Sequence, residues 1–75
     1  MQELVEAIAK SLVDNPDAVS VKATEDESGL LLELTVDPDD MGKVIGKQGR
    51  IAKAIRTVVK AAAVRENKKV QVEIL

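Results

Sequence analysis

Two segments of the chain place apolar side chains on one face of a helix. In residues 2–14 the apolar positions follow an i, i+4, i+8 spacing: Leu4, Val5, Ile8, Ala9, Leu12 and Val13. The pattern ends at Asn15, because the following Pro16 disfavours helical geometry in the residue before it. In residues 50–65 the apolar face consists of Ile51, Ala52, Ile55, Val58, Val59, Ala62 and Ala63. Both segments are therefore predicted to be helices that pack on a core.

Three shorter segments alternate apolar and polar side chains, as half-buried strands do. The inward positions are Val19, Val21 and Ala23 in residues 18–25, Leu30, Leu32, Leu34 and Val36 in residues 30–36, and Val70, Val72 and Ile74 in residues 69–74. Leu31 breaks the alternation on the outer face. Residues 26–29 are a turn by composition, so the first two strands are predicted to pair as an antiparallel hairpin.

A short helix is predicted between the second strand and the long helix. Asp37, followed by further acids, marks its start, and Met41, Val44 and Ile45 form its apolar stripe. Gly46 stands where a glycine ends a helix. Asn67 is predicted to end the long helix in the same way.

These elements follow one another in the order αββααβ and fit one domain, residues 1–75. The connection from the second to the third strand passes through two helices, which favours parallel pairing with a right-handed crossover. Because each strand has one apolar face, the helices are expected on that face and water on the other. The predicted fold class is α/β, an α+β two-layer sandwich with a three-stranded mixed sheet and helices on one face.

Composition argues against catalysis. The chain has no Cys, His, Trp, Tyr or Phe, and none of its hydroxyl side chains lies in a recognisable nucleophile setting. The phosphate-binding motifs GxxxxGK[ST] and GxGxxG are absent. A helix cap explains Asp37, Asp39 and Asp40 better than a magnesium site does. We therefore expect no enzyme, no catalytic residue, no cofactor and no metal.

The first residues of the chain and its apolar runs bear on location. Glu3 and Glu6 stand where a signal peptide carries basic residues. The longest apolar runs are far too short to span a bilayer. A cytoplasmic protein without membrane contact is the expectation.

Charge is divided unevenly along the chain. Residues 1–42 carry 11 acidic and two basic side chains, whereas residues 43–69 carry nine basic and one acidic. The net charge of −2 therefore hides a basic segment that suits a polyanion. Lys53, Arg56 and Lys60 fall opposite the core face of the long helix, either as a solvated face or as part of that polyanion surface.

The centre of the basic segment is the turn from Gly46 to Gly49. Glycine tolerates positive φ and leaves room for close backbone approach. Lys47 and Arg50 place positive charge beside the start of the long helix, where backbone N–H groups favour a phosphate. The turn is therefore the predicted ligand site, and the rest of the chain is its scaffold.

The run from Ile45 to Arg50, IGKQGR, resembles the I-G-x-x-G-[KR] signature of KH domains, and the αββααβ order is similar to the type II, bacterial form of that fold. The run VIGKQGRIAKAIRTVV and the small size resemble the bacterial KH proteins of the KhpA (YlqC) family. The resemblance covers essentially the whole chain.

The resemblance implies a protein that clamps the backbone of about four nucleotides of single-stranded RNA in its GxxG turn. The implied site comprises Lys43, Val44, Ile45, Gly46, Lys47, Gln48, Gly49, Arg50, Ile51 and Lys53. Of these, the apolar members would lie beneath the bases, and Lys43, Arg50 and Lys53 would flank the phosphates. Without aromatic side chains, binding is expected to be weak, strongly salt-dependent and of low sequence specificity. The role implied is post-transcriptional regulation or RNA chaperoning, and single-stranded DNA is an alternative ligand.

The resemblance also implies pairing, either of two copies or with a larger KH-containing partner of the KhpB (Jag) type. One flank of the long helix carries small side chains that allow close helix approach: Ala54, Thr57, Ala61 and Val64. The same residues suit an ordinary exposed helix face. The alternative function is therefore a protein-interaction module that keeps a KH fold.

Overall fold

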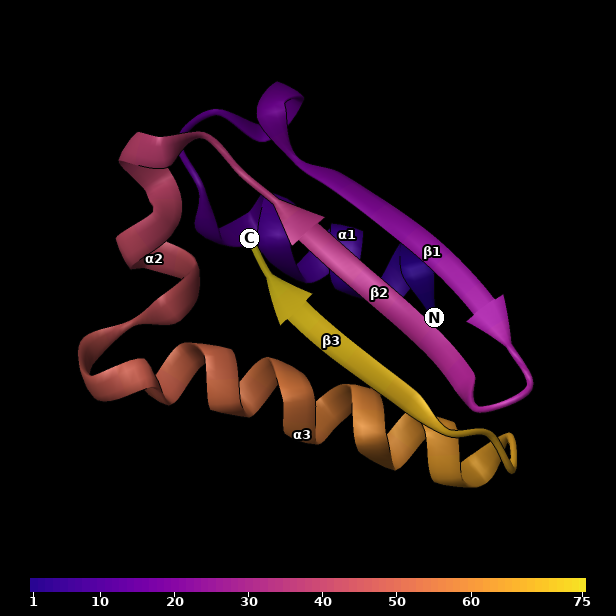
Figure 1. Ribbon diagram of the computed structural model, residues 1–75. Helices are drawn as coiled ribbons and strands as arrows, with labels where there is room; N and C mark the ends of the chain where they lie inside the picture. Colours follow the sequence, from indigo (N-terminus) through magenta and orange to yellow (C-terminus); the bar gives the residue numbers. More distant parts are fainter.

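The computed structural model describes all 75 residues and confirms the predicted order of elements (Figure 1). Its helices and strands are α1 (Gln2–Leu12), β1 (Ser20–Asp26), β2 (Gly29–Thr35), α2 (Met41–Ile45), α3 (Arg50–Arg65) and β3 (Val70–Ile74). Three single 3-10 turns occupy Pro16–Ala18, Pro38–Asp40 and Lys47–Gly49. The predicted ends differ from the observed ends by no more than two residues, except at α2. Asp37 was predicted to mark the start of that helix, but a 3-10 turn at Pro38–Asp40 precedes it and α2 begins at Met41.

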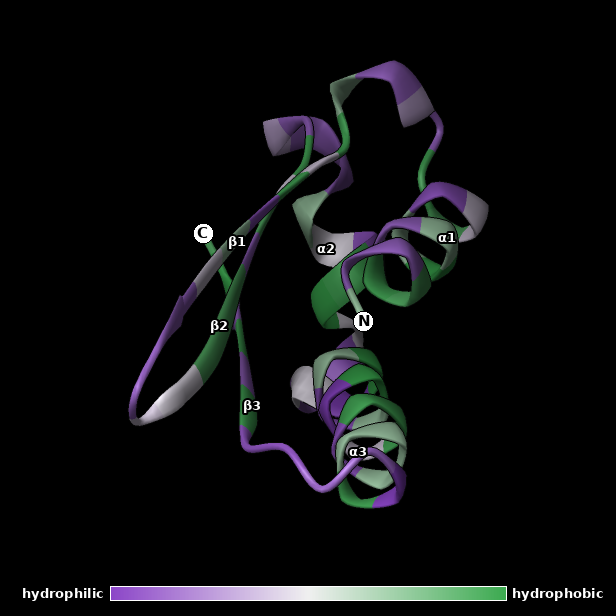
Figure 2. Cartoon of the chain, turned by 90° about the vertical axis from the view of Figure 1, so that its right-hand side faces the viewer, coloured by the Kyte–Doolittle hydropathy of each residue, from purple (hydrophilic) through white to green (hydrophobic).

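The sheet has the predicted mixed topology, in the order β1-β2-β3. β1 and β2 are antiparallel, with Asp26 paired to Gly29 across the turn, and β2 and β3 are parallel, with Leu32 opposite Val72. Figure 2 shows α1, α2 and α3 on one side of the sheet and none on the other. The expected two-layer arrangement is therefore confirmed. No helix combines the length and apolar character that crossing a bilayer requires.

The core lies between the sheet and the helices. Its largest fully buried side chains are Leu32, Leu34, Val5, Val44 and Val59. They come from α1, β2, α2 and α3, so each helix contributes at least one side chain that is removed from water. Burial of these apolar groups is the main force that holds the layers together.

Two predicted core positions are wrong. Ala23 is exposed, because the hairpin runs beyond the helices and its tip stands clear of them (Figure 2). Val58 is 47% exposed, because α1 covers only part of the α3 surface. Val58 instead lines a groove beside Ile8 and Leu12 of α1. Periodicity gives the direction of a side chain but not the extent of the element that covers it.

Asn67 ends α3 as predicted. It follows the capping residue Glu66 and adopts a left-handed conformation with φ 56°. The N–H of Lys68 donates to the carbonyl of Ala63 at 2.9 Å, which closes the last turn in the Schellman manner. The chain then reverses into β3, and this reversal places β3 alongside α3.

Candidate functional site

The turn between α2 and α3 contains three residues with positive φ. Gly46 has φ 76° and ψ 174°, and Gly49 has φ 73° and ψ 15°. Between them Gln48 also lies in the left-handed region, with φ 58° and ψ 25°. Such geometry is uncommon for a residue with a side chain and is often found at functional sites. The sequence pattern predicted the role of the two glycines but gave no sign that Gln48 would share their geometry.

Backbone hydrogen bonds and packing hold the turn in place. The N–H of Gly46 donates to the carbonyl oxygen of Gly42 at 2.8 Å. The N–H of Gly49 donates to the carbonyl oxygen of Gly46 at 3.1 Å. A Cβ atom built on Gly46 would lie only 2.6 Å from Cγ1 of Ile51. Ile51 therefore packs directly beneath the turn, and only a glycine at position 46 leaves room for it.

The turn presents polar groups at the start of α3. No side chain caps the N-terminus of this helix, so its first backbone N–H groups lack side-chain acceptors. Lys47, Gln48 and Arg50 are all exposed around them, and an Nη atom of Arg50 donates to Oε1 of Gln48 at 3.4 Å. The backbone N–H groups of Gly49 and Arg50 donate to carbonyls of the turn itself, those of Gly46 and Lys47. The positive helix end and two cations therefore form the surface that attracts an anion such as phosphate.

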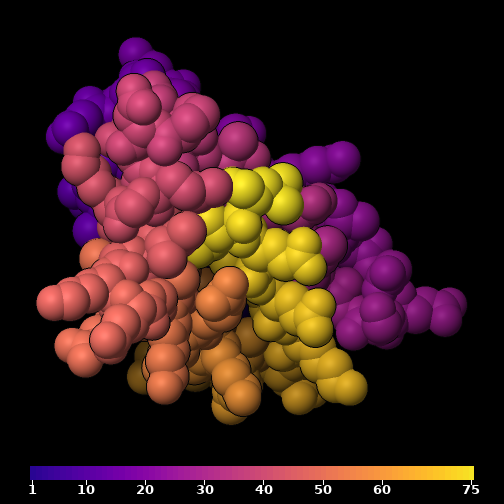
Figure 3. All heavy atoms as spheres, turned by 60° about the vertical axis from the view of Figure 1, so that its left-hand side comes forward, coloured from indigo at the N-terminus to yellow at the C-terminus, as the bar shows by residue number.

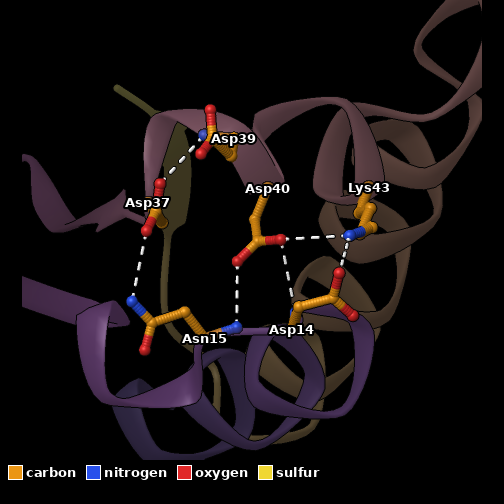
Figure 4. A network of polar contacts seen from close by, with 6 residues as sticks. All are labelled: Asp14, Asn15, Asp37, Asp39, Asp40 and Lys43. Atoms are coloured by element: carbon orange, nitrogen blue, oxygen red, sulfur yellow. Dashed lines mark hydrogen bonds and ion pairs between the residues drawn. The ribbon is translucent and has the colours of Figure 1, made fainter.

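A buried carboxylate fixes α2, and with it the start of the turn. Asp40 is 2% exposed and accepts hydrogen bonds from the backbone N–H groups of Asp14 (3.3 Å) and Asn15 (3.0 Å). Lys43 donates to both Asp40 and Asp14 (Figure 4). Asp37 caps the N–H of Asp39 at 3.0 Å, as its predicted role as a cap requires. The network ties the segment after α1 to the first turn of α2.

These contacts change the pKa values of two groups. Burial raises the pKa of Asp40, but the hydrogen bonds from Asn15, Asp14 and Lys43 outweigh it, so the pKa lies below its ordinary value of 3.8. Hydrogen bonds to Asp14 and Asp40 raise the pKa of Lys43 above its ordinary value of 10.5. Both groups therefore remain charged around neutral pH and act as a structural pair. The local sequence predicted Asp40 only as part of a helix start, and it gave no sign of the distant partners of this carboxylate.

Two expected binding residues need correction. Val44 is 0% exposed, so its side chain contributes to the core and cannot touch a base. Lys43 is held between Asp14 and Asp40, so its charge is already compensated. In contrast, Ile45 is 37% exposed and Lys53 is exposed on α3. The open part of the expected site is therefore the turn, with Ile45, Arg50 and Lys53 around it.

A groove lies between α3 and β3. It has a volume of about 350 Å³ and is lined by Arg56, Lys60, Val70, Gln71, Val72 and Glu73. Figure 3 shows the face on which the turn, α3 and the yellow strand β3 meet. Helical spacing predicted Arg56 and Lys60 on a basic stripe outside the expected binding site, because spacing alone does not show which strand a stripe faces.

The expected dimer flank lies on a different surface of α3. Ala54, Thr57, Ala61 and Val64 are all exposed, and Val64 is 71% exposed. Ala54 borders the apolar groove with Ile8, Ile51 and Val58, which has a volume of about 350 Å³. An open apolar surface therefore runs along α3, apart from the groove beside β3.

Comparison with known proteins agrees with this fold. The family described as "KhpA/KhpB, KH domain" matches residues 2–74. The RNA-binding protein KhpA of Clostridium perfringens is 71% identical over 75 residues, and that of Clostridium acetobutylicum is 68% identical over the same length. In both cases the match covers all of this chain and all of the relative.

A solved structure shows the same fold within a larger protein. Era from Aquifex aeolicus matches 97% of this chain with a TM-score of 0.68 and 24% identity, and the match covers 28% of Era. At this identity the likeness concerns the fold alone. It shows that the arrangement of helices and sheet described above also occurs in an experimental structure.

Proposed function

The chain belongs to the KhpA/KhpB KH-domain family, and on that premise we propose that it binds single-stranded RNA through the turn from Gly46 to Gly49. The observation that carries the proposal is the geometry of this turn: it stands at the uncapped N-terminus of α3 with Lys47, Gln48 and Arg50 exposed around it. The relatives are named RNA-binding proteins. Their family is not an enzymatic one, so the chain is not an enzyme.

The proposed contacts with RNA are of two kinds, polar contacts to phosphates and apolar contacts to a base. The side chains of Lys47, Gln48 and Arg50, which surround the N-terminus of α3, contact the phosphates of about four nucleotides. Lys53 extends the positive surface along α3. Ile45 and the edge of Ile51 supply apolar contact for an unstacked base. Val44 and Lys43 are left out, because one is fully buried and the other is ion-paired.

Affinity is expected to depend mainly on phosphates. The chain has no aromatic side chain on which a base can stack, and that contact contributes about 1–3 kcal/mol per base in other single-strand binders. A single copy therefore binds weakly, with a strong salt dependence and low overall sequence specificity. Such binding fits RNA chaperoning or post-transcriptional regulation better than recognition of one defined target.

The test is fluorescence anisotropy with short labelled RNAs across a salt series. The double variant Lys47→Asp with Gln48→Asp is compared with wild type and with Lys22→Asp with Thr24→Asp, which makes the same change in charge on the exposed outer side of β1. The turn variant is expected to lose affinity and to lower the salt slope by about 0.7 for each lost phosphate contact. Equal losses in the two variants would show that only net charge matters. A matched single-stranded DNA tests whether the 2′-hydroxyl is needed.

We also propose that the exposed flank of α3 pairs with a second KH domain, either another copy or a KhpB-like protein. Ala54, Thr57, Ala61 and Val64 are exposed small or apolar side chains, which allow two helices to approach closely. The variant Ala61→Glu is expected to abolish a dimer measured by sedimentation while leaving the circular dichroism spectrum unchanged. If the dimer persists in this variant, the flank is not the interface. Pairing of two grooves would raise affinity for a long RNA through effective concentration.

A further inference from the structure

The two edges of the sheet differ in how far they are covered. β3 runs beside α3, and the carbonyl oxygen of Val72 accepts a hydrogen bond from Nε of Arg56 at 3.3 Å. β1 is the other edge strand, and Figure 1 shows no helix alongside its outer edge. Every residue of β1 except Val21 is exposed. β1 therefore offers an open sheet edge, whereas β3 does not.

The hydrogen-bond pattern shows which backbone groups of β1 point outward. The N–H of Leu30 donates to the carbonyl oxygen of Lys69 at 2.8 Å, so even-numbered residues of β2 face β3 and odd-numbered residues face β1. Leu31 of β2 lies opposite Thr24, so the even-numbered residues of β1 bond to β2. The residues whose N–H and C=O groups point away from the sheet are therefore Val21, Ala23 and Glu25.

Only part of this outer edge is occupied. Nε2 of Gln2, at the start of α1, donates to the carbonyl oxygen of Val21 at 2.6 Å, as the outward direction of that group requires. No side chain or loop reaches the backbone of Ala23 or Glu25 in the same way. The N–H and C=O groups of these two residues therefore lack protein partners. An unpaired edge of this kind is a template for an added strand.

The open edge is acidic. Residues 25–27, at its end, all carry carboxylates and form no ion pair within the chain. Lys22 is the only basic residue of β1, and Lys68 and Lys69 lie on the other side of the hairpin tip, towards β3. Residues 1–42 carry 11 acidic and two basic side chains. Opposite charges across a strand pair favour pairing and like charges oppose it, so a basic strand fits this edge better than a second copy of the chain.

We propose that the edge of β1 binds an extended basic segment of a partner protein, which adds a strand beside residues 23–26. The backbone of Ala23 and Glu25 supplies the hydrogen bonds, and lysine or arginine side chains of the partner lie opposite Glu25 and Asp26. The bond from Gln2 limits the added strand, because the carbonyl of Val21 is already taken. This contact lies apart from the turn and from the α3 flank, so it goes beyond the proposed RNA binding.

The experiment is an NMR titration of the isotope-labelled protein with a short capped peptide that alternates lysine and valine. At saturation, hydrogen exchange of the Ala23 and Glu25 amides is expected to slow by about fivefold, the effect of one net backbone hydrogen bond. The Thr24 amide already faces β2 and is expected to change little. One control peptide has glutamate in place of lysine, and another keeps the lysines but has a central proline, which removes a donor from the strand. Neither control is expected to protect the two amides.

Two variants test the two parts of the contact. Ala23→Pro removes an outward N–H at an edge position, where proline is tolerated, and is expected to weaken binding of the lysine–valine peptide by about fivefold. Glu25→Gln with Glu27→Gln keeps the backbone and is expected to weaken binding by about threefold. The matched control, Glu66→Gln with Glu73→Gln, removes two acids away from β1 and is expected to have little effect. If Ala23→Pro does not fold, as judged by circular dichroism, the exchange of the wild-type amides decides.

Unchanged exchange of Ala23 and Glu25 at every concentration of the lysine–valine peptide would overturn the proposal, and so would equal binding of the lysine and glutamate peptides. Stronger protection by a peptide of residues 19–27 would identify a second copy as the occupant and would also overturn it. Shifts confined to the groove around Ile8 and Val58 would place the peptide between α1 and α3 instead, with the same consequence. RNA binding at the turn is tested separately, by the anisotropy experiment above.

Discussion

Adding one methyl group to the turn should have very different effects at its two glycines. Gly49 has a left-handed conformation, and a Cβ atom placed on it would have no neighbouring atom within 4 Å. Gly49→Ala is therefore expected to lower the free energy of unfolding by about 1–2 kcal/mol, from backbone strain alone. Gly46 combines φ 76° with ψ 174°, a region used almost only by glycine, and its Cβ would lie 2.6 Å from Cγ1 of Ile51. Strain and overpacking together are expected to cost about 2–6 kcal/mol in Gly46→Ala.

These losses are large for a domain of this size. At about 0.05–0.15 kcal/mol per residue, a chain of 75 residues has about 4–11 kcal/mol of stability. Gly46→Ala therefore removes a large part of it, whereas Gly49→Ala leaves a folded protein. The control is Gly42→Ala, because Gly42 is helical with open space around it and alanine favours a helix by up to about 1 kcal/mol.

The assay is urea unfolding followed by far-UV circular dichroism, because the chain has no aromatic residue to report by fluorescence. A double-mutant cycle with Ile51→Ala separates the two contributions at Gly46, since removal of Cγ1 and Cδ1 relieves part of the clash. The packing of Ile51 beneath the turn is refuted if Gly46→Ala and Gly49→Ala lower the free energy of unfolding by amounts that agree within about 0.5 kcal/mol. It is also refuted if the double-mutant cycle shows no coupling between Ile51→Ala and Gly46→Ala.

Two further predictions concern the network around Asp40. The pKa of Asp40 is lowered when the chain folds, so its carboxylate stabilises the fold above pH 3.8 and this contribution is lost as the pH falls through the lower folded value. Asp40→Asn is therefore expected to lower Tm at neutral pH and to flatten the fall of Tm with acid, and an unchanged acid profile by thermal circular dichroism would contradict this assignment. Lys43 is already paired with Asp14 and Asp40, so Lys43→Ala is expected to leave the salt slope of RNA binding unchanged. Lys47→Ala is expected to lower that slope by about 0.7. Equal salt slopes for the two variants would show that Lys43 contacts the phosphates as well.

The fold was largely predictable because its signals are local. Periods of two and about 3.6 residues distinguish strands from helices, and glycine, proline and aspartate mark the turns between them. One apolar face per element then leaves few arrangements for three strands and three helices, and the sheet order and the parallel pair of β2 and β3 followed. The two glycines of the turn were predictable for the same reason, since they provide a backbone geometry that other residues rarely adopt.

The composition of the site was less predictable, because it depends on residues that meet across elements. Val44 and Ile45 are both apolar neighbours in a short helix, yet one is fully buried and the other is 37% exposed. Lys43 and Lys47 are both lysines beside the turn, yet only Lys43 meets carboxylates from two segments. Periodicity alone does not separate such pairs when the helix has only five residues.

The sequence by itself determined the order of elements and the place of the GxxG turn, because each follows from residues within one or two turns of the chain. It also determined the sheet pairing, because a short turn joins β1 to β2 and two helices join β2 to β3. Only the tertiary structure decided that Asp40 binds backbone N–H groups 25 and 26 residues away and that Arg56 meets Val72 of the edge strand. Both contacts form when α2 closes on the segment after α1 and when β3 returns beside α3. No local sequence pattern predicts such contacts, since they depend on how the assembled layers place residues that are distant in sequence.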